Sequence, residues 1–209
     1  MQELGEAWDA VASDAEREVD LRLAELPADA TVLGLFFRSV LEAVEALRGP
    51  EAMEACREEC EGAGEFVDFF AYPARDFLKV LRRAAWEMDG KTGGFEETLR
   101  ILGYLGTAAL LRGQAGRAVD LMLSGTPRRV VENLPTAYRV TTPAGGPLSV
   151  VWWGQTGARI LFTRDALPRP YLEGSLEALL KKAGARGLRI HGRALGPLSS
   201  EYNVAWVVE

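Results

Sequence analysis

The spacing of apolar residues changes part-way along the chain, and this change constrains the fold more than any other feature. Between Leu33 and Leu47 the apolar residues recur at intervals of three and four, which is typical of an amphipathic helix. After about residue 135 the interval falls to two, which is typical of strands with one buried face. We therefore expect an α+β protein in which a helical N-terminal half packs on a largely antiparallel sheet.

The same periodicity and the positions of Pro and Gly predict the individual elements. The predicted helices span residues 15–26, 33–47, 51–61, 73–89, 94–112, 114–124 and 127–134. The sheet is predicted to have about five strands with one inserted helix. The strands cover 136–142, 148–153, 157–163 and two segments around 188–190 and 202–208, and the helix covers 169–183.

A chain of 209 residues, 48% hydrophobic and 26% charged, is long enough for one substantial core. We expect an acidic N-terminal extension over residues 1–18 and a single α+β domain over 19–209, with its helical part running to about 134. No apolar run reaches the roughly 20 residues that span a bilayer, and the acidic start does not resemble a secretory signal. Cys56 and Cys60 lie in an acidic helical segment, so a reducing cytoplasmic setting is expected.

The net charge of −6 conceals an uneven distribution of charge along the chain. Residues 1–70 carry 18 acidic and 5 basic residues, whereas residues 71–209 carry 12 acidic and 19 basic residues. Two interpretations remain open. Either the two parts neutralise each other within one fold, or the second part presents a basic surface to an acidic partner.

The residues needed for familiar catalytic and metal sites are missing. His191 is the only histidine, so a zinc site built on several histidines is excluded within one chain. Gly90-Lys91-Thr92 resembles the end of a phosphate-binding loop, but the first glycine of that motif is replaced by Ala85. We therefore expect a protein that is not an enzyme and that holds no metal or cofactor.

Two groups of residues are candidate partner surfaces. Arg189, His191 and Arg193 alternate with Leu188 and Ile190, so they are expected on the outer face of a strand. There they would either face solvent alone or contact an anion or an acidic peptide. Trp86 shares a helical face with Arg82 and neighbouring basic residues, which suits an interface anchor. The alternative is that Trp86 packs against another part of its own chain.

Small residues in the helical region suggest a ligand pocket. Gly106, Ala109 and Gly113 interrupt an otherwise apolar segment, and each glycine inside a helix lowers its stability by about 0.5–1 kcal/mol relative to alanine. These three residues are therefore predicted to line a space for an apolar ligand. Close packing of two helices is the alternative explanation.

Several sequence blocks together resemble a known family. The runs ATVLGLFFRSVLEAV, GTPRRVVENLPTAYRV and SEYNVAW are similar to blocks of a paralogous family of myxobacterial proteins of unknown function. This resemblance covers about residues 19–208 and implies no activity.

The layout also resembles the haem-nitric-oxide-binding (H-NOX) fold, which is shared with 4-vinyl-reductase sensor domains and TRAPP subunits. The likeness rests on a helical half, the segment Thr126-Pro127-Arg128, strands, a helix with Tyr171 and Gly174, and two last strands. In haem-binding members the iron ligand is a histidine on the helix before the Thr-Pro segment, but residues 114–124 read QAGRAVDLMLS. Their Tyr-x-Ser-x-Arg motif falls at 162–166, which reads FTRDA. The resemblance implies this fold without haem.

We therefore expect a non-enzymatic regulatory or sensory module in bacterial signalling that binds a small apolar ligand or a protein partner. The alternative is an interaction or dimerisation adaptor with no ligand pocket. Binding of nucleic acid and a membrane span are not expected. An apolar cavity between helices 73–124 and the sheet would favour the first hypothesis.

Overall fold

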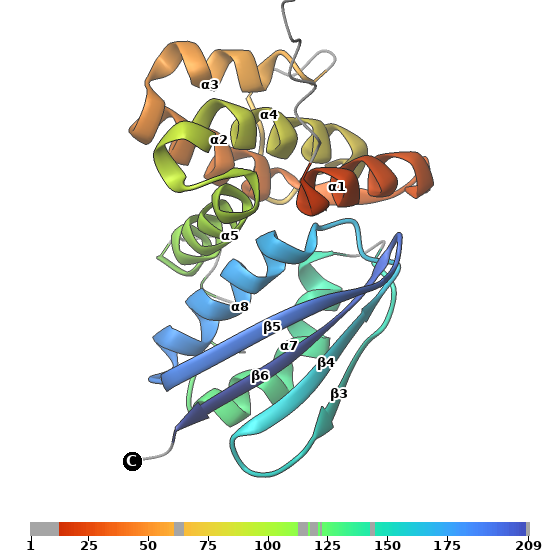
Figure 1. Ribbon diagram of the computed structural model, residues 1–209, viewed down its shortest axis with the longest axis vertical. Coiled ribbons are helices and arrows are strands. Elements are labelled where there is room, and N and C mark those ends of the chain that lie inside the picture. Colours follow the sequence, from red (N-terminus) through yellow and green to blue (C-terminus); the bar gives the residue numbers. More distant parts are fainter. Residues whose placement is uncertain are drawn as a thin grey trace, which may run out of the picture.

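The computed structural model describes residues 13–60, 65–112, 117, 121, 123–142 and 145–207. Within these residues the chain forms seven helices and six strands. Figure 1 shows a layer of helices at one end of the molecule and a sheet at the other, with α5 (Phe95–Arg112) and α8 (Arg169–Lys182) between them. The predicted α+β class is therefore confirmed.

The helical layer contains four further helices, which are α1 (Asp14–Glu25), α2 (Gly34–Arg48), α3 (Pro50–Arg57) and α4 (Ala74–Thr92). In α2 the predicted apolar stripe is buried, and Phe37, Val40 and Val44 are fully shielded from solvent. Gly49 ends α2, and Pro50 occupies the first turn of α3, where its missing N–H leaves no hydrogen bond unmade.

The helical layer also contains a short two-stranded sheet that the sequence analysis did not predict. Strand β1 (Thr31–Leu33) pairs antiparallel with β2 (Ala71–Pro73). Each strand has only three residues and leads directly into a helix, so neither carries enough alternation to be recognised from sequence.

The main sheet has four antiparallel strands in the order β3-β4-β6-β5. Their bounds are Leu148–Trp152 for β3, Gly157–Thr163 for β4, Arg186–Gly196 for β5 and Ser199–Val207 for β6. Ile160 of β4 lies opposite Tyr202 of β6, and both side chains are fully buried. Helices α7 (Pro127–Thr141) and α8 cover this buried face, and Figure 1 looks onto the opposite, open face.

The predicted strand at 136–142 is wrong, because α7 continues through Pro135 to Thr141. Tyr138 and Val140 alternate with polar residues over too few positions to separate a strand from a helix. The buried side chains of α7 are spaced as on one helical face, and they are Val130, Val131, Leu134, Ala137 and Tyr138. Val140 is exposed, as that face requires.

One buried arginine joins the helical layer to the sheet. Arg22 of α1 is completely buried, and its Nη2 donates a hydrogen bond of 2.8 Å to Ser200 Oγ of β6. Its Nη1 donates to the backbone carbonyl of Asp165, and its Nε donates to Glu18 Oε1 at 3.0 Å. Helix α1 is thus linked in the interior to strand β6 and to Asp165, which are far away in the sequence.

The buried apolar side chains form one core cluster that extends from Ala15 to Trp206. It includes residues from all the helices of the helical layer and from both central strands, β4 and β6. A search of the described residues finds no helix with the length and apolarity needed to cross a membrane.

Candidate ligand cavity between the helices and the sheet

An apolar cavity of about 80 Å³ lies where α5, α7 and α8 meet the covered face of the sheet. Leu110 of α5, Leu134 of α7, Phe162 of β4 and Leu176 of α8 are among its lining residues. The predicted alternation places Phe162 on the inner face, and the predicted stripe of α8 places Leu176 inward, so both elements present apolar side chains to the same space.

Three of the five hydroxyl groups among the described residues of the cavity wall are engaged by the protein itself. Ser175 Oγ donates to the backbone carbonyl of Tyr171 at 3.0 Å, and Thr141 Oγ1 donates to that of Ala137 at 3.1 Å. Tyr138 donates its phenolic O–H to Asp165 Oδ1 at 2.8 Å. No charged side chain is among the described residues that line the cavity. The wall therefore suits an apolar guest, because it directs no charge toward one.

Behind this wall lies a buried carboxyl group. Asp165 is fully buried, and its Oδ1 accepts a second hydrogen bond from the backbone N–H of Leu167 at 3.1 Å. Its Oδ2 has no hydrogen-bond partner among the described residues. Burial raises the pKa of Asp165, and the nearby positive charge of Arg22 opposes that rise. Burial thus makes the ionised form of Asp165 less favourable here than in water.

The described residues of α5 that line the cavity are sequence neighbours of the residues that were predicted to line it. Helix α5 contributes Thr107 and Leu110. A Cβ on Gly106 would lie 3.1 Å from the hydroxyl oxygen of Tyr171, so this glycine faces α8. Ala109 is half-buried and is not among the lining residues. Gly113 lies outside the described residues.

The glycines of α5 and α8 allow the two helices to approach closely. A Cβ on Gly103 would lie 1.9 Å from the backbone oxygen of Tyr171, and a Cβ on Gly174 would lie 1.9 Å from that of Arg100. No side chain fits at either position, so these glycines allow close packing of α5 on α8. Close packing of two helices is the alternative explanation for the small residues in this region.

Three lining residues were missed because α7 was expected to end at residue 134. Ala137, Tyr138 and Thr141 lie on the part of α7 that was assigned to a strand. The signal that identifies them is the helical spacing of Leu134, Ala137 and Tyr138, read across Pro135.

Trp86 and Arg82 contact the N-terminal helix of their own chain. Trp86 Nε1 donates to Glu16 Oε1 at 2.9 Å, and Arg82 forms an ion pair with Asp20 at 3.0 Å. The guanidinium of Arg82 also lies 5.1 Å from the centroid of the Trp86 ring. These contacts attach α1 to α4, so Trp86 and Arg82 are engaged within their own chain.

Arg189, His191 and Arg193 are exposed on the open face of the sheet, on the side that their alternation predicts. Leu188 and Ile190 of the same strand are half-buried. Arg193 Nη2 pairs with Glu201 Oε1 of β6 at 2.8 Å. The exposed positions of the three residues are thus those that the sequence predicts.

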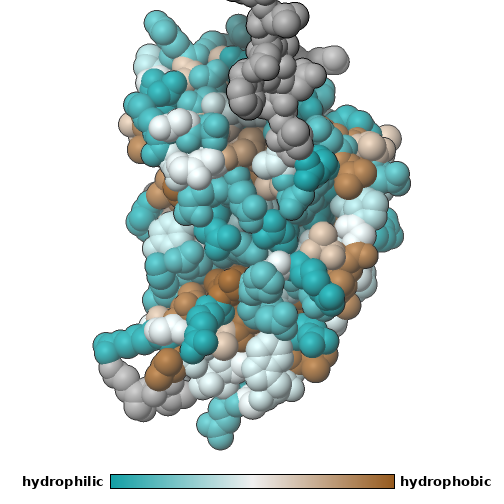
Figure 2. Space-filling view, in the orientation of Figure 1, coloured by the Kyte–Doolittle hydropathy of each residue, from teal (hydrophilic) through white to brown (hydrophobic). Residues whose placement is uncertain are grey.

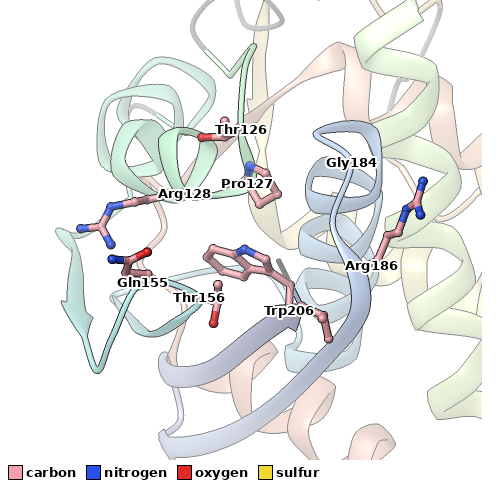
Figure 3. Close-up of a pocket in the computed structure, with 9 residues that line it drawn as sticks. Thr126, Pro127, Arg128, Gln155, Thr156, Gly184, Arg186 and Trp206 are labelled. Carbon is pink, nitrogen blue, oxygen red and sulfur yellow. The ribbon is translucent and has the colours of Figure 1, made fainter. Parts of the chain in front are cut away.

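A larger, open cleft of about 700 Å³ lies at the end of the sheet where α7 begins. Figure 3 shows Pro127 and the indole of Trp206 at its centre, with the guanidinium groups of Arg128 and Arg186 pointing away from that centre. Arg128 instead stacks 4.2 Å from the centroid of the Trp152 ring and pairs with Glu132. The cleft does not gather its charges around one ligand position, so the smaller apolar cavity is the better candidate.

Solved structures show the same fold at low sequence identity. The Fe(II) unliganded H-NOX protein from K. algicida has a TM-score of 0.66 and 11% identity, with 85% of this chain and 97% of that chain covered. The Fe(II)NO H-NOX protein from S. oneidensis has a TM-score of 0.67 and 10% identity, covering 84% and 99%. The Fe(II)CO H-NOX from Shewanella woodyi has a TM-score of 0.62 and 14% identity, covering 83% and 94%. The H-NOX-like fold implied by the sequence is therefore confirmed.

Sequence comparison gives a family without an assigned activity. No curated protein matches the sequence. The model of one family matches residues 26–207, which is most of the chain, and that family is described as a protein of unknown function (DUF2378). The chain therefore belongs to the DUF2378 family, as the resemblance to a family of unknown function predicts.

Proposed function

We propose that this protein is a non-enzymatic regulatory or sensory module that binds a small apolar ligand in the cavity between α5, α7, α8 and the sheet. The observation that carries the proposal is the chemistry of the cavity wall. Three of the five hydroxyl groups among its described lining residues are bonded to the protein's own carbonyl and carboxyl oxygens. Most of its other side chains are apolar, and none of the described ones is charged. The fold shared with H-NOX proteins, one of them in an Fe(II)NO ligation state, supports a ligand-binding module.

The volume of the cavity limits the size of the ligand. At about 80 Å³ it is smaller than the ~300 Å³ at which drug-sized pockets begin. It is closer to an engineered apolar cavity of about 150 Å³ that stays dry and binds benzene or xenon. The ligand is therefore a molecule of a few heavy atoms, unless side chains such as those of Leu176 and Leu179 move aside for a larger one.

The described cavity does not fit a haem group. The H-NOX structures that share the fold are Fe(II) forms, one unliganded and one with NO bound. Haem iron in proteins is held by His, Cys, Met or Tyr. Among the described lining residues only Tyr138 belongs to this set, and its hydroxyl is bonded to Asp165. His191 lies exposed on β5. We propose that this chain has kept the fold and binds its ligand without haem.

The cysteines support a reducing compartment as the setting of this module. Cys56 and Cys60 are both free and buried, and burial raises the pKa of each thiol to about 12. At neutral pH both are thus protonated and unreactive. We propose a cytoplasmic location because both cysteines are free, which is usual in a reducing compartment.

The proposal is tested by native mass spectrometry of protein purified from its own host. We expect a bound mass in addition to the chain, released on denaturation. Ala137→Leu adds three carbon atoms at a buried lining position and should abolish that mass. Ala109→Leu makes the same change at a half-buried position outside the lining and should retain it. A bound mass that survives in Ala137→Leu would place the ligand elsewhere.

Haem is tested separately by titration of hemin into the purified protein. We expect no Soret band that persists after desalting, in wild type and in His191→Ala alike. A persistent band in both would contradict the haem-free proposal, because it would require a ligand other than the only histidine.

A further inference from the structure

The open face of the main sheet is a second surface with a distinct composition. The register places residues of four strands side by side on this face. Val151, Arg159, Asn203 and His191 form one row across the strands, and Ser149, Leu161, Glu201 and Arg193 form the next. In Figure 2, which has this face toward the viewer, apolar and hydrophilic side chains lie intermixed over the strands. We call these two rows, together with Trp153 and Arg189, the open-face surface.

Trp153 is a pre-organised aromatic ring on this surface. A Cβ on Gly157 would come within 1.8 Å of Trp153 Nε1, so the indole lies directly over this glycine. The backbone N–H of Trp153 donates to the carbonyl of Gly157 at 3.1 Å, which fixes the turn that carries the ring. Trp153 is nevertheless 50% exposed, and neighbouring Val151 is 61% exposed. A fixed, half-exposed indole loses little conformational entropy on binding, which is typical of interface anchors.

Positive charge adjoins this ring. Arg159 and Arg193 flank Glu201, with Nε of Arg159 at 4.0 Å and Nη2 of Arg193 at 2.8 Å from its carboxylate oxygens. Arg189 pairs with Ala205, which pairs with Gly157 beneath Trp153. The surface thus carries three arginines and one glutamate, and that glutamate is shared between Arg159 and Arg193. Arginine and tryptophan are the residues most enriched at binding hot spots.

We propose that the open-face surface docks an acidic protein segment that places an apolar side chain on Trp153 and carboxylates on Arg189 and Arg159. Charge complementarity identifies this occupant. A second copy of the same face would bring like charges together, which disfavours a symmetric dimer through it. Single-stranded nucleic acid favours several stacking rings, whereas this face offers one, on a chain of net charge −6.

The segment lies across the face and does not extend the sheet at β5. The backbone N–H of Gly192 on this edge strand donates to Glu173 Oε1 of α8 at 2.7 Å, and the pairing register shifts near both ends of β5. Such features protect an edge from further strand pairing. Arg189 of β5 lies two strands from Gly157 of β4, over which the Trp153 indole lies. This separation is about 10 Å, a distance that an extended chain covers in about three residues. The acidic residue should therefore follow the apolar one by two to four positions.

The test uses the full chain and the peptide acetyl-Ser-Gly-Phe-Gly-Glu-Glu-Asp-Glu-amide, followed by the NMR signals of the Trp153 indole N–H and of the backbone amides of Arg159 and Asn203. We expect saturable shifts of these signals. The amide signals, which remain in every variant, should report a loss of affinity of about tenfold or more in both Trp153→Ala and Arg189→Ala. Raising the salt concentration should weaken binding, because the contacts are largely ionic. Trp86→Ala is the matched control, since Trp86 is 48% exposed on α4, and it should bind as wild type does. A peptide with lysine at the four acidic positions should not bind.

Three results would overturn this proposal. The first is the absence of a Trp153 shift at millimolar peptide, or equal binding of the lysine peptide. The second is tighter binding of oligothymidylate at the same signal, which would assign the surface to nucleic acid. The third is a wild-type dimer in sedimentation that Arg189→Ala dissociates, which would assign it to a second copy. Because Arg189 is exposed, its variant keeps the test valid should Trp153→Ala fail to fold.

Discussion

Asp165 is the residue at which burial and charge act against each other most directly. Its carboxyl group lies between the cavity wall residue Tyr138 and the buried guanidinium of Arg22. Arg22 is bonded to the backbone carbonyl of Asp165 and to Glu18, so its charge is shared among several acceptors. Removing a carboxylate from water is unfavourable unless it is fully paired, and Oδ2 has no partner in the described residues.

This environment makes stability depend on pH through Asp165. Its raised pKa means that above about pH 3.9, the ordinary pKa of aspartate, the native state holds a proton that the unfolded chain has lost. The free energy of unfolding therefore falls as pH rises until the native pKa is passed. Asp165→Asn cannot lose that proton, so we expect its stability relative to wild type to increase with pH, by at most about 1.4 kcal/mol per pH unit.

Unfolding midpoints between pH 4.5 and 8 measure this difference. Asp29→Asn, at an exposed position, is the control and should follow wild type throughout. A difference between Asp165→Asn and wild type that stays constant over this range would show that Asp165 is ionised in the native state at every pH tested.

At the scale of elements, the contact between α5 and α8 depends on glycines that permit close approach. Gly103 lies against the backbone of Tyr171, and Gly174 lies against that of Arg100. Backbones that approach this closely leave no room for a Cβ, and the surrounding helices would have to separate. The small residues of α5 thus have a packing role at Gly103, while the next helical face, at Thr107 and Leu110, borders the cavity.

Gly103→Ala should therefore destabilise the protein by about 1–3 kcal/mol or more, because the new methyl group overpacks the contact. Gly90→Ala is the matched control, since a Cβ on Gly90 of α4 meets nothing within 4 Å. That substitution should be neutral or stabilise by up to about 1 kcal/mol through helix propensity. Urea unfolding of both variants beside wild type gives the comparison. Equal stability of Gly103→Ala and wild type would mean that α5 and α8 can separate freely.

The elements that the sequence predicted well are those with long, regular apolar stripes. The stripe of α2 and the alternation in β4 persist over enough residues to exclude the other periodicity. The end of α7 was misassigned because Tyr138 and Val140 suit a strand as well as a helix over so short a run. Arg22 was not identified as buried, because its partners Asp165 and Ser200 are far away in the sequence. A cavity was expected between the helices and the sheet, and one lies there. On α5 its described lining is Thr107 and Leu110, each one residue after the predicted Gly106 and Ala109.

For the whole molecule, the uneven charge along the sequence is partly neutralised by contacts between its two parts. Asp20 pairs with Arg82, and Glu18 pairs with Arg169 at 3.6 Å. Together with Arg22, these contacts place the acidic N-terminal helix against the basic remainder. Two arginines of the open-face surface, Arg159 and Arg193, instead share Glu201 within the second part of the chain.

We expect the acidic first third of the chain and the basic remainder to unfold as one cooperative unit, because their apolar side chains share one core. Limited proteolysis tests this expectation. Cleavage should give either intact chain or small fragments. Two stable fragments divided between residues 60 and 75 would instead indicate two independent domains.

The central claim is that the apolar cavity binds a small apolar molecule, and methyl NMR under xenon pressure tests it most directly. Xenon enters dry apolar cavities without the need for hydrogen bonds. We expect saturable shifts at the methyl groups of Leu110, Leu176 and Leu179, which line the cavity. These shifts should be lost in Ala137→Leu and kept in Ala109→Leu. Shifts that do not saturate, or that persist unchanged in Ala137→Leu, would contradict the claim that this cavity is a ligand site.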